Sequence, residues 1–581
     1  MVLSIASANN SPRSVLSIPH PTNPAVSSIV FAVHNTLHIA ARATTASSNA
    51  AISPLTTTAI PTPAPLHTGV ITTLCSITIF HLKTTPASLA SSLFTGGSDG
   101  IVNLAIPAPP SPSSPNSANK YDITVIPTPP NSPAISSLSS ITYNNHLILA
   151  IARAASNPIE LYTALLPTAL PAANSPPLSL TFTPLPSLPV PSIATVLTLH
   201  ALPDTHTLIL AAACAVPSNN KVHIFRSPLA SLAAVPPFLP AGSLPGHQDW
   251  IRSLSFTPPS MNPPILASSS HDQKVRLWTF HDAITRAPTA NNPDVADVDL
   301  VEDSIDVDTL LGDAARIVIP PGHPVTLAAL LISHEESVSS TAWHPTSPVP
   351  RLLTSSMDRT LLIWEADTDS TIWLPTARLG AAGGILGGSI GTTLLGFIDA
   401  LFEPDGNRLI GHGYGGSLHC WETDCDSSTA DSFVTIPGVT GHFGPVRSIS
   451  WDPSSHYLLS TSADQTTRLW APLKDTTTYL EMCRPQVHGH GMTAVCALSS
   501  ELFVSGADEK HLRIFAMPQT AVNILAKFTT FEPPRDPENP RVARAYLPAL
   551  GLTVKGGNDE AEEEVRPHTC VNKGGGDVNR G

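Results

Sequence analysis

Short runs of alternating residues recur along the chain, and the clearest copy lies within the segment Gly441 to Trp470. Its first run, 446–451 (VRSISW), alternates between two sets of side chains. A turn sequence (DPS) follows, then a second run at 457–461 and a third that ends at Trp470. Alternation with a period of two is typical of strands that bury one face. The segment therefore predicts three short β-strands joined by tight turns.

Degenerate copies of this unit occur on both sides of it, and most of them end on an aromatic closing residue. A unit of three or four strands cannot bury both of its faces alone, so the copies must stack on one another. An N-terminal pair of strands (29–33 and 36–40) brings the count to nine units. The other eight units close at Ala105, Tyr162, Phe225, Trp278, Trp364, Trp421, Trp470 and Phe515.

Such repeats predict an all-β fold of the β-propeller class, in which sheets stack as blades around a centre. Seven is a common number of blades, so nine units suggest one seven-bladed ring up to about Glu422 and an incomplete second propeller. A single larger or irregular ring is the alternative. The predicted divisions are an N-terminal segment 1–27, a first propeller 28–428, a partial second propeller 441–552 and a polar tail 553–581.

An aspartate recurs in the turn before the third run, where a carboxylate can accept hydrogen bonds from backbone N–H groups. In the clearest copy we expect His442 to bridge Asp464 to a strand hydroxyl such as Ser462, and this hydroxyl to face the indole of Trp470. This set is typical of WD40 blades. The predicted structural blade residues are His247, Asp272, Trp278, His334, Asp358, Trp364, His442, Asp464, Trp470, Asp508 and Phe515.

The composition fits a large β-protein with long connections. Of the 581 residues, 42% are hydrophobic and 60 are prolines, which central strands exclude. A net charge of -14 argues against extensive phosphate binding, although a local basic face stays open. Seven scattered cysteines indicate reduced thiols in an intracellular protein, and no secretory signal is expected from the N-terminal sequence.

Several segments between the repeats predict insertions. The Pro/Ser-rich stretches 107–115, 127–133 and 167–191 indicate extended surface connections, and the acidic run 294–308 indicates a mobile loop. The span 379–398 has no charged residue and could be taken for a membrane segment. Its seven glycines favour a soluble loop that leads into a strand, and no membrane association is expected.

Two kinds of chemistry can be drawn from these residues, and both are disfavoured. His442, Ser462 and Asp464 contain the groups of a hydrolase triad, as do His247, Ser270 and Asp272. A catalytic set is needed once, however, whereas a turn-stabilising set is needed in every repeat, and neither Ser462 nor Ser270 lies in a Gly-x-Ser-x-Gly elbow. The structural interpretation is therefore preferred, and no catalytic residue is predicted.

The pair His488 and His490 suggests a metal site. Structural zinc usually takes four ligands with Cys/His pairs at short spacing, and the nearby cysteines here are the isolated Cys483 and Cys496. A duplicated blade-opening Gly-His pair is the preferred interpretation. No phosphate-binding Gly-rich loop and no cysteine cluster for an iron–sulfur centre occur, so no metal and no cofactor is predicted.

Several strings are more particular than the general repeat. They include GHQDWIRSLSF (246–256), GHFGPVRSISWDP (441–453), SADQTTRLWAP (462–472), RPQVHGH (484–490) and FVSGADEKHLRIFAMP (503–518). Together they resemble the Elongator complex protein 2 family of WD-repeat subunits over about 246–518. The chain departs from the family in its Pro/Ser-rich insertions and in its tail from Lys555. It ends near the third blade of the second propeller, which natural truncation or a shortened gene model would explain equally.

The resemblance implies a scaffold rather than an enzyme. The Elongator family modifies the 5 position of wobble uridines in transfer RNA through a catalytic subunit on another chain. The expected partners are that catalytic subunit and the large scaffold subunit, in the cytoplasm and also the nucleus. Direct transfer-RNA contact stays open. The alternative function is a general WD40 adaptor in another assembly, such as a ubiquitin ligase or a ribosome-assembly platform.

Overall fold

A computed structural model of the chain describes its strands and most of the turns between them. The described residues are 15–20, 23–33, 36–42, 55–59, 67–68, 70–76, 78–79, 92–107, 121–129, 131–143, 145–166, 180–202, 206–215, 220–228, 235–282, 316–320, 323–367, 372–380, 396–414, 416–423, 433–436, 438, 441–442, 444–474, 479–487, 490–509, 511–531, 545–546 and 555–556. The chain divides into a first unit, Ser7–Phe443, and a second unit that includes Gly444–Gly581.

The first unit contains the sheets that we number 1 to 4 in its N-terminal half. Sheet 1 comprises β1 (Val15–His20), β2 (Asn23–Val33), β3 (Thr36–Arg42) and β4 (Leu55–Ala59). Sheet 2 comprises β5 (Ile71–Ser76), β7 (Leu93–Gly97), β8 (Val102–Pro107) and β9 (Tyr121–Val125). Sheet 3 comprises β10 (Ile135–Tyr143), β11 (His146–Arg153), β12 (Ser156–Leu165) and β13 (Thr183–Leu188), with the short β6 (Thr78–Ile79) added beside β10. Sheet 4 comprises β14 (Ala194–Leu202), β15 (Thr207–Cys214), β16 (Val222–Pro228) and β17 (Leu239–Leu244).

Three further sheets complete the described part of this unit. Sheet 5 comprises β18 (Ile251–Phe256), β19 (Ile265–Ser270), β20 (Lys274–Phe280), β22 (His323–Ile332) and β21 (Arg316–Ile319). Sheet 6 comprises β23 (Val338–Trp343), β24 (Arg351–Ser356), β25 (Thr360–Ala366) and β26 (Trp373–Gly380). Sheet 7 comprises β27 (Phe397–Phe402), β28 (Arg408–Gly413), β29 (Leu418–Thr423) and β30 (Phe433–Ile436).

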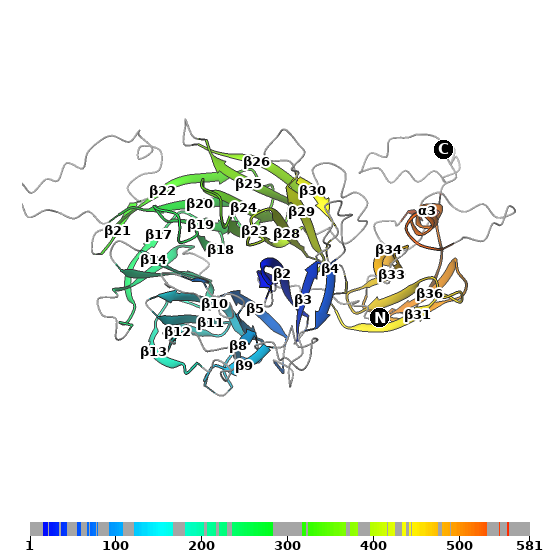
Figure 1. Ribbon diagram of the computed structural model, residues 1–581, viewed down its shortest axis with the longest axis horizontal. Helices are drawn as coiled ribbons and strands as arrows, with labels where there is room; N and C mark the ends of the chain where they lie inside the picture. The colour runs from blue at the N-terminus through cyan, green and yellow to red at the C-terminus, as the bar shows by residue number, and fades with distance from the viewer. Residues whose placement is uncertain are drawn as a thin grey trace, which may run out of the picture. The chain divides into compact units, whose positions relative to one another are not determined.

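Each of these sheets is built mainly from strands that pair antiparallel in chain order, which confirms the predicted all-β fold of the propeller class. The first strand of a sheet contacts the first strand of the next, in the order β5, β10, β14, β18, β23 and β27, and β1 contacts both β5 and β27. Figure 1 shows the sheets of the first unit around a common centre. The predicted numbers of blades and the predicted domain limits stay predictions.

The closing residues named from the sequence lie on the third strand of their sheets. Trp278 on β20 is opposite Leu266 on β19, and Trp364 and Trp421 are opposite Leu352 and Leu409 in the same way. The closing aromatic is therefore placed on the face of a sheet, where the neighbouring sheet can cover it.

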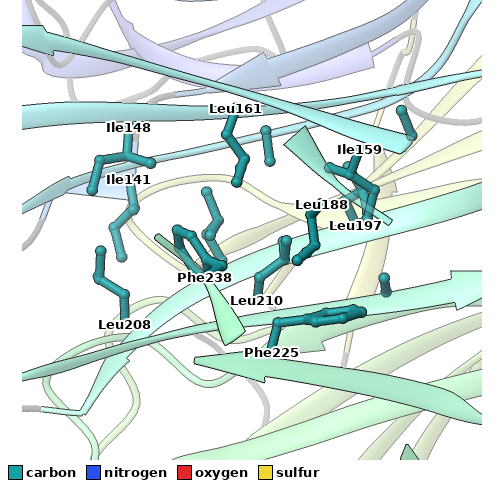
Figure 2. Packing of buried hydrophobic residues seen from close by; sticks show 14 of the residues in the cluster. Ile141, Ile148, Ile159, Leu161, Leu188, Leu197, Leu208, Leu210, Phe225 and Phe238 are labelled. Carbon is teal, nitrogen blue, oxygen red and sulfur yellow. The ribbon is translucent and has the colours of Figure 1, made fainter. Parts of the chain in front are cut away.

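Apolar side chains fill the spaces between sheets. Between sheets 3 and 4, Leu210 and Leu161 pack with Phe225 and Phe238 in a cluster that excludes water (Figure 2). Complete burial of a leucine side chain stabilises the fold by about 1.5–3 kcal/mol, so such clusters provide the main attraction between sheets. The apolar side chains of the alternating runs are thus buried where a sheet faces its neighbour.

Serines on the first strands solve a second problem, which is the unpaired edge of each sheet. The backbone N–H groups at this edge have no strand beside them and need other acceptors. The N–H of Leu197 donates to Ser137 Oγ at 3.1 Å, that of Thr341 to Ser253 Oγ at 3.2 Å and that of Ala400 to Ser340 Oγ at 2.9 Å. Each acceptor lies in the preceding sheet. The serines of the alternating runs therefore join neighbouring sheets.

The second unit contains two sheets of the same kind. Sheet 8 comprises β31 (Val446–Trp451), β32 (Leu458–Ser462), β33 (Thr466–Pro472) and β34 (Tyr479–Val487), and sheet 9 comprises β35 (Met492–Ala497), β36 (Leu502–Ala507) and β37 (Leu512–Ala516). The N–H of Ala497 donates to Ser450 Oγ at 3.0 Å. The helix α3 (Gln519–Phe528) contacts β34 and places Leu525 in the core of this unit. A short pair, β38 (Ala545–Tyr546) and β39 (Lys555–Gly556), follows.

One predicted insertion differs in the structure. The segment 167–191 contains β13, which pairs only with β12 and forms the outer edge of sheet 3. Proline is compatible with this position because an outer strand need not donate on its free side. The central part of the span 379–398 and the acidic run 294–308 lie outside the described residues, while Leu379 belongs to β26 and Ile398 to β27. Among the described residues, no helix is long and apolar enough to cross a bilayer.

A substitution between sheets 3 and 4 tests the importance of this packing. Leu210 is fully buried, so Leu210→Ala should lower the free energy of unfolding by about 2–5 kcal/mol through lost contacts and a cavity. The matched control Leu165→Ala removes a side chain that is 68% exposed and should change it by about 0.5 kcal/mol or less. Urea denaturation followed by tryptophan fluorescence measures both. Equal effects of the two variants would contradict the proposed role of the cluster.

Candidate functional site

The recurrent histidine and aspartate meet in sheet 5. His247 Nδ1 lies 3.0 Å from Asp272 Oδ2, and its Nε2 lies 2.9 Å from Ser268 Oγ. The carboxylate can only accept, so Nδ1 carries the proton and Nε2 accepts from the serine hydroxyl. Trp278 Nε1 then donates to the same hydroxyl at 3.2 Å. Four side chains from the entry turn, the second strand, the next turn and the third strand thus form one chain of hydrogen bonds.

Sheet 6 repeats this geometry with threonine as the hydroxyl. His334 Nδ1 lies 2.8 Å from Asp358 Oδ2, and its Nε2 lies 2.8 Å from Thr354 Oγ1. The indole Nε1 of Trp364 donates to Thr354 Oγ1 at 3.0 Å. The hydroxyl is therefore the required group at this position, and its carbon skeleton is free to vary.

The turn explains why the acidic residue is aspartate. The residue after it adopts a left-handed backbone conformation, with φ of 68° at Gln273 and 70° at Arg359. The short side chain folds back over this turn, so that Asp272 Oδ1 accepts from the N–H of Lys274 at 3.1 Å while Oδ2 accepts from the N–H of Gln248 at 3.0 Å. One carboxylate thereby ties two separate loops together.

A third set in sheet 2 was missed from the sequence. His67 Nδ1 lies 2.9 Å from Asp99 Oδ1 and His67 Nε2 lies 2.9 Å from Thr95 Oγ1. The closing residue Ala105 has no side-chain donor, and Asn103 Nδ2 donates to His67 Nε2 at 3.3 Å instead. The histidine follows leucine rather than glycine, and it precedes its aspartate by 32 residues rather than 25 or 24. The signal that could have found it was Asp99 itself.

In sheet 8 the predicted hydroxyl is wrong by two positions. Trp470 Nε1 donates to Ser460 Oγ at 2.8 Å, whereas Ser462 Oγ accepts from the N–H of Asp464 at 3.1 Å. Both serines lie on one face of β32, and the register places Trp470 opposite Leu458, nearer to Ser460. The same correction applies in sheet 5, where Ser270 Oγ accepts from the N–H of Asp272. The serine at the end of the second strand thus accepts a hydrogen bond from the turn, and the serine in the middle of the strand accepts one from the indole.

The remaining predicted residues are placed less completely. His442 is buried and belongs to the first unit, whereas Asp464 belongs to the second, so their predicted bridge stays a prediction. The N–H of Asp508 donates to the carbonyl of Gly491 at 2.9 Å. The ring of Phe515 stacks on Phe503 with centroids 5.1 Å apart. Among described residues, no hydrogen bond joins Asp508 to a histidine.

The metal hypothesis cannot be followed through both of its histidines. His488 lies outside the described residues, and His490 is exposed. In the part of the chain that the structure describes, no group of three or more His, Cys, Asp or Glu side chains is arranged to hold a metal ion. The nearby Cys483 is half-buried, and its removal from water raises the pKa of its thiol to about 12, which disfavours the thiolate that a metal would need.

The hydrolase hypothesis meets a barrier of access. The order Asp–His–hydroxyl in sheets 5 and 6 matches that of a catalytic triad, but Ser268 and Thr354 are both fully buried. Each hydroxyl also accepts the N–H of a buried tryptophan, which covers the oxygen that would have to attack. A substrate carbonyl could not approach either oxygen within bonding distance. These sets hold loops in place.

The electrostatics of the set agree with that role. Burial by itself raises the pKa of Asp272, but the hydrogen bond from His247 and the backbone donors of Gln248 and Lys274 lower it to about 2. The same balance, with Thr360 as a further donor, holds the pKa of Asp358 below its ordinary value. The ionised carboxylate is thus the form that the folded chain binds.

The pH dependence of stability tests this assignment. The pKa of Asp272 is about 2 in the folded chain against an ordinary 3.8, so its contribution is present above pH 3.8 and is lost as the pH falls through about 2. Asp272→Asn should therefore cost about 1–3 kcal/mol at pH 7, and the difference from the parent should shrink on acidification below pH 3.8. Urea denaturation at several pH values measures this. The control Asp282→Asn changes an exposed carboxylate and should show no such trend.

The comparisons with known proteins agree with this geometry. The family model described as "WD domain, G-beta repeat" matches residues 238–279, 326–365 and 434–471. Each of these matches begins near or within the fourth strand of one sheet and covers the first three strands of the next.

Relatives extend the similarity beyond single repeats. Elongator complex protein 2 of Schizosaccharomyces pombe is 31% identical over 360 residues, which cover 60% of this chain and 44% of that protein. The human protein of the same name is 32% identical over 381 residues, covering 62% and 42%, and the Saccharomyces cerevisiae protein is 33% identical over 346 residues, covering 57% and 41%. The match thus spans less than half the length of these relatives. The chain contains WD40 repeats in the three ranges that the family model matches, and the predicted resemblance to Elongator complex protein 2 is confirmed over about 60% of its length.

Proposed function

We propose that the chain is a non-catalytic scaffold subunit of an Elongator complex. The observation that carries this proposal is its similarity to Elongator complex protein 2 of fission yeast and humans, which continues across several sheets. The proposed partners are the large scaffold subunit and the catalytic subunit. Through them the chain would support modification of the 5 position of wobble uridines in transfer RNA, in the cytoplasm and also the nucleus.

The physical properties of the described sheets suit a scaffold. The His–Asp–hydroxyl–Trp sets fix the turns at the ends of the strands, and buried clusters fix the sheets against one another. A rigid framework lowers the conformational entropy that the loops themselves lose when a partner binds, because those loops are already ordered. In these sets the carboxylates, imidazoles and hydroxyls that an active site could use are already hydrogen-bonded to one another.

Reconstitution tests the assignment of partners. The tagged full chain is mixed with the purified large scaffold and catalytic subunits of an Elongator complex and analysed by gel filtration. We expect the three chains to elute together. Elution of the chain apart from both subunits would contradict the proposal. Capture of cullin-type or pre-ribosomal partners in place of Elongator subunits would favour the general WD40 adaptor.

The absence of catalysis is tested on the buried hydroxyls. In cells that lack the chain, we expect wobble-uridine modification to fall, and we expect expression of the chain to restore it. The double variant Ser268→Ala and Thr354→Val removes both oxygens while it keeps most of the side-chain volume. If its melting temperature shows that it is folded, this variant should restore modification to the level of the parent. Loss of modification by a folded variant would show that the hydroxyls take part in chemistry.

A further inference from the structure

The first strand of each of sheets 2 to 7 contains a bulge one residue after its start. At a bulge an extra residue leaves the ladder and its side chain is redirected. We call the side chains at these positions the rim residues. They are Thr72, Ser136, Thr195, Arg252, Ser339 and Ile398.

Hydroxyl groups at the rim join neighbouring sheets. Thr72 Oγ1 donates to the carbonyl of Ile135 at 2.8 Å. Ser136 Oγ donates to the carbonyl of Ala194 at 2.8 Å, which is the residue before the next bulge. Ser339 Oγ donates in the same way to the carbonyl of Phe397 at 2.6 Å. A small hydroxylated residue is therefore the choice that stabilises the fold at this position.

Ile398, which is buried, and Arg252 lack this hydroxyl, and Arg252 is the one charged side chain among the six. It is exposed, and no ion pair or hydrogen bond of its guanidinium to a described residue occurs. Sheets 5 and 6 are joined without it, because Ser253 and Ser255 both contact Thr341 and the indole of Trp343 donates to the carbonyl of Ser255. The surrounding protein removes part of the water around the guanidinium and lowers its pKa, although the side chain reaches the surface. A charge without a structural partner at this place indicates a use outside the fold.

Trp250 lies two residues before Arg252 and is 54% exposed. The residue at the same distance after the histidine of sheet 6 is Ser337, which is buried. The backbone N–H of Trp250 donates to its neighbour Asp249, which holds the turn and leaves the indole ring at the surface. Tryptophan and arginine are the two side chains that most often dominate binding at protein interfaces.

We propose that Trp250 and Arg252 form a docking site for an acidic segment of a partner protein. The guanidinium would form a bidentate pair with an aspartate or glutamate carboxylate of that segment. Such a pair is stronger where protein shields it partly from water than where it is fully exposed. The indole would cover the adjacent part of the segment and exclude water from the pair.

Charge argues for a peptide rather than for RNA. Single-stranded nucleic acid is usually held by a groove with many cations, and here the other rim residues are uncharged. The loop of sheet 6 that corresponds to 248–250 carries the exposed Glu335 and Glu336, which would repel a phosphate backbone along its length. A single carboxylate can reach one guanidinium without passing these groups.

Fluorescence anisotropy with the full-length chain tests the proposal. The probes are a labelled peptide with one glutamate among glycines and serines, the same peptide with glutamine for glutamate, and a single-stranded RNA. We expect the glutamate peptide to bind, the glutamine peptide to bind more weakly, and added salt to weaken the first more than the second. Arg252→Thr introduces the type of residue found at other rim positions, so the variant should stay folded, and it should weaken glutamate-peptide binding about tenfold. Trp250→Ser should weaken it too.

A matched pair of variants controls for charge and surface. Arg378→Thr and Leu374→Ser remove an exposed cation and an exposed apolar side chain from β26 of sheet 6, and neither should change binding. The proposal is wrong if the glutamate peptide does not bind, or if Arg378→Thr weakens binding of this peptide as much as Arg252→Thr does. It is also wrong if the RNA binds more tightly than the peptide and loses its binding in Arg252→Thr, because the site would then recognise phosphate.

Discussion

The structure depends on one constraint, which is that no sheet of this chain can satisfy its own first edge or cover its own faces. Apolar clusters answer the second need, as Leu210 and Phe225 do between sheets 3 and 4. Serine hydroxyls answer the first, because Ser137, Ser253 and Ser340 accept the edge N–H groups of the next sheet. Both the apolar cover and the hydroxyl acceptors come from the adjacent sheet. Stability is therefore a property of adjacent sheets, and a weak repeat is supported by the repeats beside it.

The polar sets at the turns solve a separate problem. Stacked sheets leave their loops without partners, and a loop that moved would expose the strand ends. Asp272 connects the entry turn to the turn before the third strand, and His247 transmits this connection to a hydroxyl in the middle of the second strand. In sheet 2 the histidine keeps its contacts with an aspartate and a threonine hydroxyl, but the additional donor is Asn103, which donates to His67 itself and not to the hydroxyl. The requirement is for donors and acceptors in order, not for particular residues.

The sequence predicted the parts of this fold that are local. Alternation and turn residues located the strands, and the closing aromatics lie on the third strands as expected because register follows from turn length. Two residues on one strand face cannot be separated by alternation alone, and this is why Ser462 was chosen where Ser460 contacts the indole. His67 was missed for another reason: it precedes Asp99 by 32 residues, against 25 and 24 for the pairs in sheets 5 and 6, so the spacing of those pairs does not identify it. The outer strand β13 was hidden by its prolines, which an edge position tolerates.

These distinctions bear on where such a chain can acquire binding. A residue in the His–Asp sets is buried and committed to several partners, so a change there costs folding free energy before it can alter recognition. A rim residue holds a bulge whose hydrogen bond can be replaced by others in the same pair of sheets, as the contacts of Ser253 and Ser255 with Thr341 show. A substitution at the rim therefore changes the free energy of folding little, but it changes the side chain that the surface presents to a partner. Arg252 occupies such a position, and the uncompensated charge there is easier to understand as selected for contact than as tolerated by packing.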